Sequence, residues 1–196
     1  MRDIDVRIAL RQSDLAQFAN DGESRVVEEM GIFRGEYRID AAVVNGHLHG
    51  YEIKSAKDTL ARLPTQAAAY GAVFDFVTLV AAVSHLERAT NLVPSWWGLR
   101  LAEPIGTSVL LTPIRQATRN PSVDPYHVAQ LLWKSEALEL LDQYGGARGF
   151  RKKPTFTIWR ELTRRLDLPE LQREVRAVLK LRQTWPSAGA QLLIRS

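Results

Sequence analysis

The sequence predicts an α/β fold, in which helices flank a mixed β-sheet and an α-helical C-terminal extension follows. A pair of strand patterns separated by Asn45-Gly46, a common hairpin turn, is the first observation that predicts it. A helical pattern and a buried apolar strand come next, and a strand–helix–strand order favours a mixed sheet. From Asp124 onward the pattern is helical throughout.

The N-terminal half contains two predicted helices and the predicted hairpin between them. Residues 2–20 have apolar side chains at helical spacing. Residues 24–30 are too short to assign by period, and fit either the end of a helix or a first strand. A turn region follows, and then the two hairpin strands at residues 38–44 and 48–55. Residues 58–74 form the clearest helix, which either begins at Pro64 or is kinked there.

Hydrophobic patterns also predict the remaining strands and helices. Strands are expected at residues 76–83, 97–102 and 108–113. A boundary at Asn120-Pro121 would divide the chain into a core of residues 1–120 and a basic helical region of residues 121–196. Helices are expected at residues 124–144, 154–166 and 169–185.

Composition narrows the class of protein. The chain has 196 residues, of which 45% are hydrophobic, so it can bury a substantial core. It contains no cysteine, which excludes disulfides, thiolate metal sites and a cysteine nucleophile. No apolar run approaches the roughly 18 residues of a membrane span, and the N-terminus is too charged for a signal peptide. We therefore expect a cytoplasmic protein with no membrane partner.

Basic residues are concentrated near the C-terminus. Residues 1–120 hold 13 basic and 14 acidic side chains, whereas residues 121–196 hold 13 and 8. Residues 148–182 alone hold 11 basic and 4 acidic side chains. Such a stretch is typical of a polyanion partner, although a solvated helical surface with extra arginines gives the same counts.

The hairpin carries three charged residues that suit metal-dependent phosphodiester hydrolysis. Asp40 lies on its first strand, and Glu52 and Lys54 lie at the end of its second. Carboxylates are ligands for Mg²⁺ or Mn²⁺, and such an ion activates water for attack on a phosphodiester. Lys54 shares a strand face with Glu52 and could hold the attacking water.

The turn decides whether these charges can meet. A strict two-residue turn would pair Asp40 with Tyr51 and point Glu52 to the opposite face. The site therefore requires one irregular residue between Asn45 and Gly50. Either a three-residue turn at residues 45–47 or a bulge at Gly50 would provide it.

The helix after the hairpin adds Gln66 and Tyr70, which share one helical face. With these, the run resembles the PD-(D/E)XK nuclease superfamily and its RecB-like branches, which have a Q-x-x-x-Y element. The phrases RIDAAVVNG, GYEIKSAKDTLARL and VPSWWG also resemble a small bacterial family within it. The resemblance covers residues 24–100, and Ile39 stands where the motif has proline.

The resemblance implies a restriction-endonuclease-like core and a Mg²⁺-dependent nuclease site. It makes Asp40, Glu52, Lys54, Gln66 and Tyr70 the catalytic residues. Metal ligands would be Asp40, Glu52 and a glutamate from the preceding element, with Glu29 the first choice and Glu28 the second. The partner it implies is DNA.

Basic side chains are candidate phosphate contacts. Arg38 and Arg62 lie near the hairpin site, although Arg38 is equally suited to pair with a nearby carboxylate. The C-terminal helices could form a helix-turn-helix or a basic wall that contacts phosphates without reading sequence. The candidates in that region are Lys152, Lys153, Arg164 and Arg165.

The sequence thus supports three functions. The first is a deoxyribonuclease acting in DNA repair or phage defence. The second is a catalytically inactive nucleic-acid-binding or regulatory module on the same fold. The third is an interaction subunit whose basic helices dock a partner protein. Each of the three functions is compatible with a homodimer.

Overall fold

A computed structural model describes residues 1–182 and residue 185 of the chain. Its centre is a six-stranded sheet in the order β1-β2-β3-β4-β5-β6. Strands β1 to β3 are antiparallel, β3 to β5 are parallel, and β6 is antiparallel to β5. The strand bounds are β1 Arg25–Ile32, β2 Tyr37–Val44, β3 Leu48–Lys54, β4 Phe76–Ala82, β5 Gly98–Ile105 and β6 Ser108–Arg115. The mixed sheet that the sequence predicts is confirmed.

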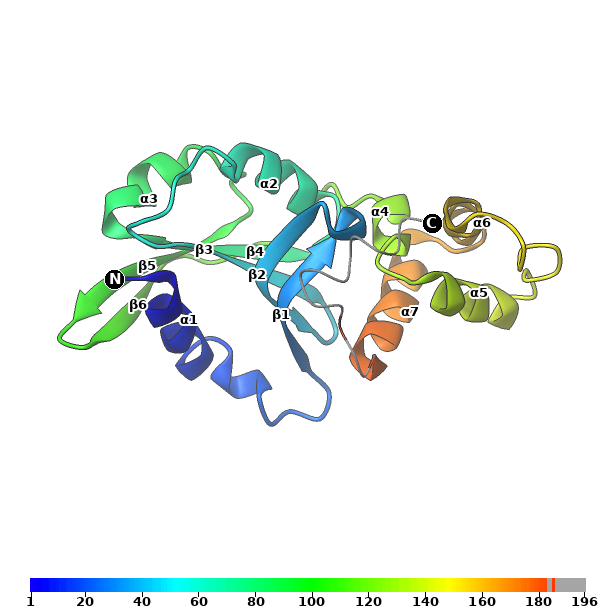
Figure 1. The fold of residues 1–196 in the computed structure, drawn as a ribbon, viewed down its shortest axis with the longest axis horizontal. Coiled ribbons are helices and arrows are strands. Elements are labelled where there is room, and N and C mark those ends of the chain that lie inside the picture. The colour runs from blue at the N-terminus through cyan, green and yellow to red at the C-terminus, as the bar shows by residue number, and fades with distance from the viewer. Residues whose placement is uncertain (183–184, 186–196) are drawn as a thin grey trace.

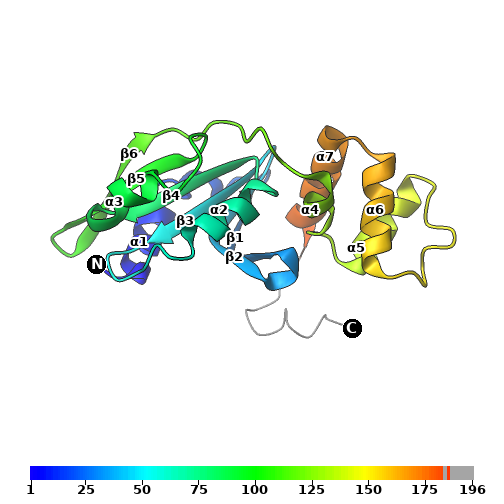
Figure 2. The ribbon, with the colours of Figure 1, turned by 90° about the horizontal axis from the view of Figure 1, so that it is seen from above.

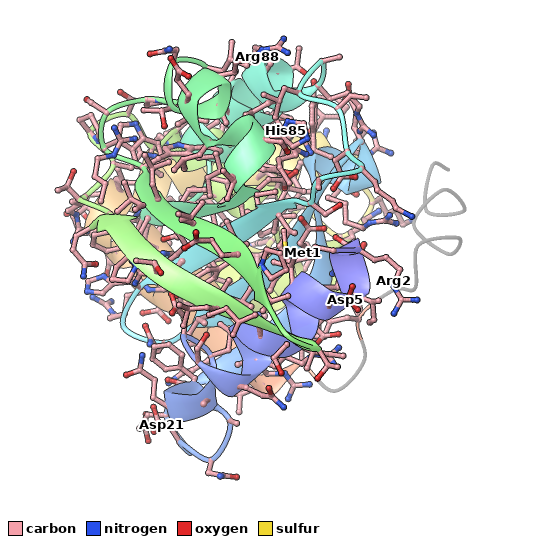
Figure 3. All side chains as sticks on the ribbon, turned by 90° about the vertical axis from the view of Figure 1, so that its left-hand side faces the viewer. Met1, Arg2, Asp5, Asp21, His85 and Arg88 are labelled. Carbon is pink, nitrogen blue, oxygen red and sulfur yellow. The ribbon has the colours of Figure 1, made fainter. Side chains whose placement is uncertain are left out.

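Helices cover both faces of this sheet. Helices α2 and α3 lie on one face and α1 lies on the other (Figures 1 and 3). In Figure 3, Arg2 and Asp5 mark α1, and His85 and Arg88 mark α3 on the opposite side. The helix bounds are α1 Asp3–Gln12, α2 Leu63–Gly71, α3 Val83–Thr90, α4 Pro125–Ala129, α5 Lys134–Gln143, α6 Thr155–Arg165 and α7 Leu168–Leu181. The short 3₁₀ helices are η1 Ala16–Phe18 and η2 Phe33–Gly35.

The two faces of the sheet bury separate cores. The smaller core lies under α1, where Val6 and Leu10 pack with strand residues such as Val43 and Ile53. The larger core lies under α2 and continues into the C-terminal helices. Apolar burial of this kind stabilises a fold by roughly 25 cal/mol for each Å² removed from water.

The hairpin between β2 and β3 has a three-residue turn. Val44 pairs with Leu48, so residues 45–47 form the turn, and the register continues regularly to Ala41 and Tyr51. The Asn45 side chain accepts the His47 N–H at 2.9 Å, which closes the turn. The predicted irregular residue is therefore confirmed in the turn. The alternative, a bulge at Gly50, is wrong, because Gly50 pairs regularly with Ala42.

Several predicted element bounds differ from the structure. The helix predicted for residues 58–74 begins only at Leu63, with Pro64 in its first turn. Proline is tolerated there, because N–H groups in the first turn have no partner within the helix. Of residues 24–30, which the sequence left open between helix and strand, residues 25–30 belong to strand β1. Helix α3 was not predicted, because it follows strand β4 without a break. The helix predicted for residues 2–20 ends at Gln12.

The helix predicted for residues 124–144 is wrong, because two helices occupy it. Asp124 begins α4, its carboxylate accepting the N–H groups of Tyr126 and His127. A second start follows at Trp133, whose N–H is bound by the Glu136 carboxylate at 2.7 Å. Helix α7 ends at Leu181, and residues 183–184 of the helix predicted to reach residue 185 lie outside the described residues, as do residues 186–196 of the predicted C-terminal region.

In addition to the shared apolar core, one buried acid joins helix α7 to the sheet. Asp75, which directly precedes β4, is 2% exposed and accepts hydrogen bonds from Gln172 and Arg176 of α7. Its carboxylate also accepts the Leu48 N–H at 2.8 Å. Figures 1 and 2 both show α5 and α6 at the end of the molecule away from the β5–β6 hairpin. Within the described residues, every helix is too short or too polar to span a membrane.

Candidate functional site

Asp40 lies where strands β2 and β3 separate. The ladder between them ends at the pair Ala41 and Tyr51, so the main chains of Asp40 and Glu52 no longer bond to each other. The Asp40 side chain takes over this role, because its Oδ2 atom accepts the Ile53 N–H at 2.7 Å. The Asp40 carboxylate therefore replaces a main-chain acceptor at the end of the β2–β3 pairing.

Arg7 of α1 binds the other side of Asp40. One guanidinium nitrogen lies 2.5 Å from Asp40 Oδ1, and another donates to the Asp40 carbonyl at 3.2 Å. The same guanidinium contacts Glu29 Oε1 at 2.6 Å and Asp3 Oδ2 at 2.5 Å. A single, largely buried guanidinium therefore bridges three carboxylates, from α1, β1 and β2.

The Glu52 side chain points toward α2, and its partners differ from those of Asp40. Its Oε1 atom accepts from Lys54 Nζ at 2.6 Å and from Gln66 Nε2 at 2.7 Å. Its Oε2 atom accepts the Tyr70 hydroxyl at 2.8 Å, and that hydroxyl also lies 2.8 Å from the Arg38 carbonyl. Lys54 further donates to Gln66 Oε1 at 3.1 Å. Four of the five predicted catalytic residues therefore form one hydrogen-bonded network.

The electrostatics follow from this burial. Burial raises the pKa of Asp40 to about 7, and the nearby Glu52 charge acts in the same direction, while Arg7 and the Ile53 N–H oppose them. Burial lowers the pKa of the Arg7 guanidinium, but the charges of Asp40, Asp3 and Glu29 outweigh it and raise the pKa overall. Burial and the Glu52 carboxylate both raise the pKa of Tyr70, which therefore stays a hydrogen-bond donor.

A polar pocket of about 440 Å³ connects the two halves of this cluster. Asp40, Glu52 and Lys54 line it together with Arg7 and Arg62. Among residues 1–182 and 185, no three His, Cys, Asp or Glu side chains are grouped so as to hold a metal ion. The oxygens that would bind Mg²⁺ or Mn²⁺ instead accept from Arg7, Lys54 and neutral donors. The donor set as arranged does not suit a divalent cation, and the expected Mg²⁺ or Mn²⁺ stays a prediction.

The other predicted site residues near the hairpin lie on different elements, and most of them form ion pairs. Glu29 lies on strand β1 with a positive φ of 53°, not on a preceding helix, and it pairs with Arg7 and Arg38. Glu28, the second choice, pairs with Arg11 on α1. Arg38 is therefore engaged by a carboxylate, which is the alternative that the sequence left open. Arg62 is exposed at the edge of the pocket.

Arg7 is the residue of the cluster that the sequence did not indicate. Its neighbours Val6 and Leu10 are buried, so Arg7 lies beside the apolar stripe of α1. An i, i+4 spacing from Asp3 is a second signal. Neither signal names the partner on β2, which lies 33 residues away along the chain.

The basic residues of the C-terminal stretch divide into two groups. Six of the eleven pair with carboxylates, and these are Arg164, Arg165, Arg173, Arg176, Lys180 and Arg182. In particular, Arg164 and Arg165 both bind Glu161 of their own helix. The other five have no carboxylate partner in the described part of the chain, and these are Arg148, Arg151, Lys152, Lys153 and Arg160.

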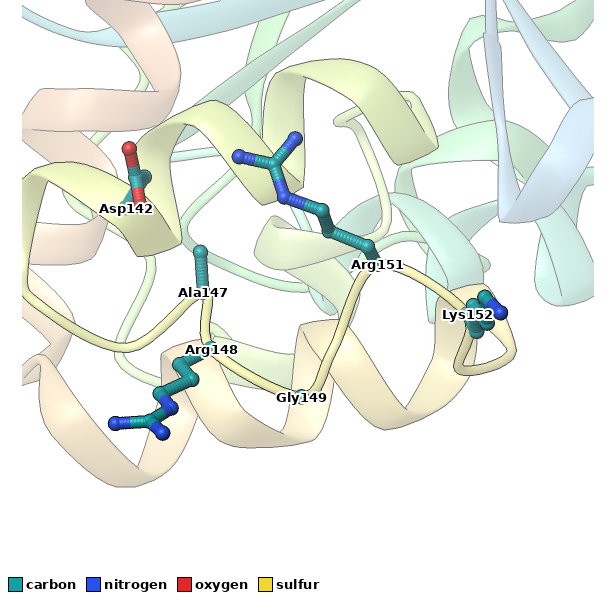
Figure 4. Close-up of a pocket in the computed structure, with 6 residues that line it drawn as sticks. All are labelled: Asp142, Ala147, Arg148, Gly149, Arg151 and Lys152. Atoms are coloured by element: carbon teal, nitrogen blue, oxygen red, sulfur yellow. The ribbon is translucent and has the colours of Figure 1, made fainter.

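Four of these unpaired cations lie on the loop between α5 and α6, called here the basic loop (residues 147–153). Arg148, Arg151, Lys152 and Lys153 are all exposed. A hollow of about 450 Å³ lies beside Arg148, Arg151 and Lys152 (Figure 4). The loop is held at its base, because the Gly146 N–H bonds to the Leu141 carbonyl at 2.8 Å. The basic loop is thus a fixed, positively charged projection far from the polar cluster (Figures 1 and 2).

Together these features define an α/β protein with a charge-compensated polar cluster in its sheet and a separate exposed basic loop. The chain belongs to the bacteriophage P4 protein cII family, whose model matches residues 7–188. It is similar to Protein cII of Enterobacteria phage P4, with 30% identity over 145 residues, or 74% of this chain and 54% of the relative. The chain therefore spans about half the length of that relative. No solved structure matches it.

Membership of this family corrects the family that the sequence motifs predicted. The chain is not assigned to the PD-(D/E)XK superfamily, and the deoxyribonuclease, hydrolase and enzyme predictions based on that resemblance are wrong. The physical reason lies in the polar cluster. Its acidic, basic and amide groups form hydrogen bonds and ion pairs with one another where β2 and β3 separate. Residue types that would suit a nuclease site therefore stabilise this part of the sheet. A fold class does not by itself specify a function.

Proposed function

We propose that this chain is a non-catalytic nucleic-acid-binding module with a regulatory role. It would act by occupying its target, because a protein that binds without cutting can affect the target only through occupancy. DNA is the partner we propose first. The observation that carries the proposal is the basic loop, where four exposed cations have no carboxylate partner among residues 1–182 and 185.

Phosphate contact accounts well for this charge arrangement. A paired arginine has already exchanged its hydration for a carboxylate, so binding a phosphate would require breaking that ion pair. An unpaired, exposed lysine or arginine can bind phosphate directly and release counterions from the nucleic acid. The predicted contacts Lys152 and Lys153 therefore keep their role, and Arg148 and Arg151 join them. Arg164 and Arg165 are left out of the proposed contacts, because both pair with Glu161.

The test compares two variants that remove the same amount of charge. The loop variant replaces Arg148, Arg151, Lys152 and Lys153 with Gln. The control variant replaces four paired, at least half-exposed arginines with Gln, namely Arg2, Arg11, Arg164 and Arg173. Binding to labelled DNA is measured by fluorescence anisotropy over a range of salt concentrations.

We expect the loop variant to bind much more weakly and the slope of log affinity against log salt to fall by about 3 to 4 units. The control variant should keep the slope of the unmodified protein. Equal losses in both variants would reduce the effect to net charge and contradict the proposal. Intact binding by the loop variant, or cleavage of the DNA with Mg²⁺ present, would also contradict it.

A further inference from the structure

An exposed aromatic ring lies directly after the basic loop. Phe156, in the first turn of α6, is 49% exposed and three residues from Lys153. Within residues 1–182 and 185, no other phenylalanine, tyrosine or tryptophan is exposed to this degree. A half-exposed ring beside unpaired cations requires an explanation, because burial of Phe156 would normally stabilise the fold.

The position of the ring is held by its own helix. Arg160 lies one turn further along α6, with its guanidinium carbon 5.8 Å from the centroid of the Phe156 ring. Arg160 itself is exposed and has no carboxylate partner in the described residues. The ring and its neighbouring cation therefore continue the positive surface of the basic loop onto α6.

The cations of the loop do not converge on one point. In Figure 4, Arg148 and Arg151 leave the loop in different directions, and Lys152 lies apart from both. A small single anion needs donors that converge on it. Cations that diverge along a loop suit a chain of phosphates instead, because successive phosphates can each meet one cation.

We propose that the basic loop and Phe156 together bind single-stranded nucleic acid, with an unpaired base stacked on the Phe156 ring. This inference rests on the proposed nucleic-acid binding and names its preferred form. Proteins that bind single strands combine a positive track for the backbone with aromatic side chains on which bases stack. In a duplex the base faces are already stacked on one another, so an exposed ring offers little to it.

The test uses single-stranded DNA and a duplex of the same sequence as probes. The variants are Phe156→Ala, Phe156→Leu and Phe156→Trp, with Ile114→Ala as a control for loss of an exposed apolar side chain on β6. We expect Phe156→Ala and Phe156→Leu to weaken single-strand binding by about 5- to 100-fold. Phe156→Trp and Ile114→Ala should bind like the unmodified protein, and duplex binding should change little in all four.

Unchanged single-strand binding by Phe156→Ala would overturn the inference, as would an equal loss on single strand and duplex. Retained affinity in Phe156→Leu would overturn stacking as well, because leucine has no ring. The loop variant separates this failure from failure of the proposed function. If the loop variant loses binding while Phe156→Ala does not, only the stacking role is wrong. If the loop variant binds normally, nucleic-acid binding by this loop is wrong.

Discussion

Arg7 of α1 binds both the side chain and the main chain of Asp40 on β2, at 2.5 and 3.2 Å. These contacts join the N-terminal helix to the point where two strands of the sheet separate. The side chains of both residues are 18% exposed, so water screens the pair only in part. Removing Arg7 leaves the partly buried Asp40 carboxylate without its cation, whereas removing Asp40 leaves Arg7 paired with Asp3 and Glu29.

A double-mutant cycle measures this relationship. We expect Arg7→Met to lower the free energy of unfolding by about 2 to 4 kcal/mol at a pH above 7, where Asp40 is ionised. Asp40→Asn should lower it by less, because burial already disfavours the ionised carboxylate and Arg7 still pairs with Asp3 and Glu29. The double variant should lose less than the sum, with a coupling of about 1 to 3 kcal/mol. Urea unfolding provides the measurement. Additive losses would show that the two side chains act independently.

Tyr70 is expected to stabilise the cluster through its hydroxyl. Its hydroxyl lies within 2.8 Å of both Glu52 Oε2 and the Arg38 carbonyl. Tyr70→Phe removes the donor and leaves a buried carboxylate oxygen short of a partner, which we expect to lower stability by about 1 to 3 kcal/mol. Tyr144→Phe is the control, because that hydroxyl bonds to carboxylates near the surface. Similar thermal stabilities for the two variants would contradict the prediction.

The two glycines of the hairpin should respond differently to alanine. A Cβ at Gly50 would lie 2.3 Å from Ile39 Cδ1 and 3.2 Å from the Phe74 ring, whereas a Cβ at Gly46 meets nothing within 4 Å. Ile39 and Phe74 are fully buried and have little room to move. We expect Gly50→Ala to lower stability by about 1 to 3 kcal/mol and Gly46→Ala to change it by less than about 0.5 kcal/mol. Chemical denaturation of both variants tests this, and equal effects would sink it.

His49 should make stability depend on pH. Burial lowers its pKa from 6.5 to about 4, and the charge of Arg100 and the nearby His47 act in the same direction. Between these values the unfolded chain binds a proton that the folded chain does not, so stability rises as pH increases from about 4 to 6.5. The contribution is at most about 3 kcal/mol. His49→Gln should flatten the stability profile across this window, and an unchanged profile would place the dependence elsewhere.

Divalent cations should have little effect on the unmodified protein. Arg7 and Lys54 already pair with the carboxylates that a metal would need. A ligand that binds only the folded state at a hundred times its Kd adds about 2.7 kcal/mol, which is readily seen as a rise in Tm. We therefore expect no measurable rise in Tm with millimolar Mg²⁺ or Mn²⁺. A clear rise that Asp40→Asn abolishes would contradict this expectation.

The sequence by itself determined the fold class and the hairpin. Period-two and helical patterns predict the strands and most helices, because burial of apolar side chains is repeated at the spacing of each element. The parity of the turn followed from charge positions alone, and the structure has the required three-residue turn. The sequence also located the basic stretch, because charge counts need no coordinates.

Only the tertiary structure decided what the charges do. Arg7 and Asp40 are 33 residues apart, and packing of α1 on the sheet brings them together. Packing of α1 and of α2 on the sheet gives the charged and amide groups of the nuclease-like motif hydrogen-bond partners within the protein. On α6, Arg164 and Arg165 both pair with Glu161, whereas the cations of the basic loop form no ion pair with any carboxylate among the described residues. A residue type predicts which chemistry is possible, but its neighbours in space determine which of its groups remain available.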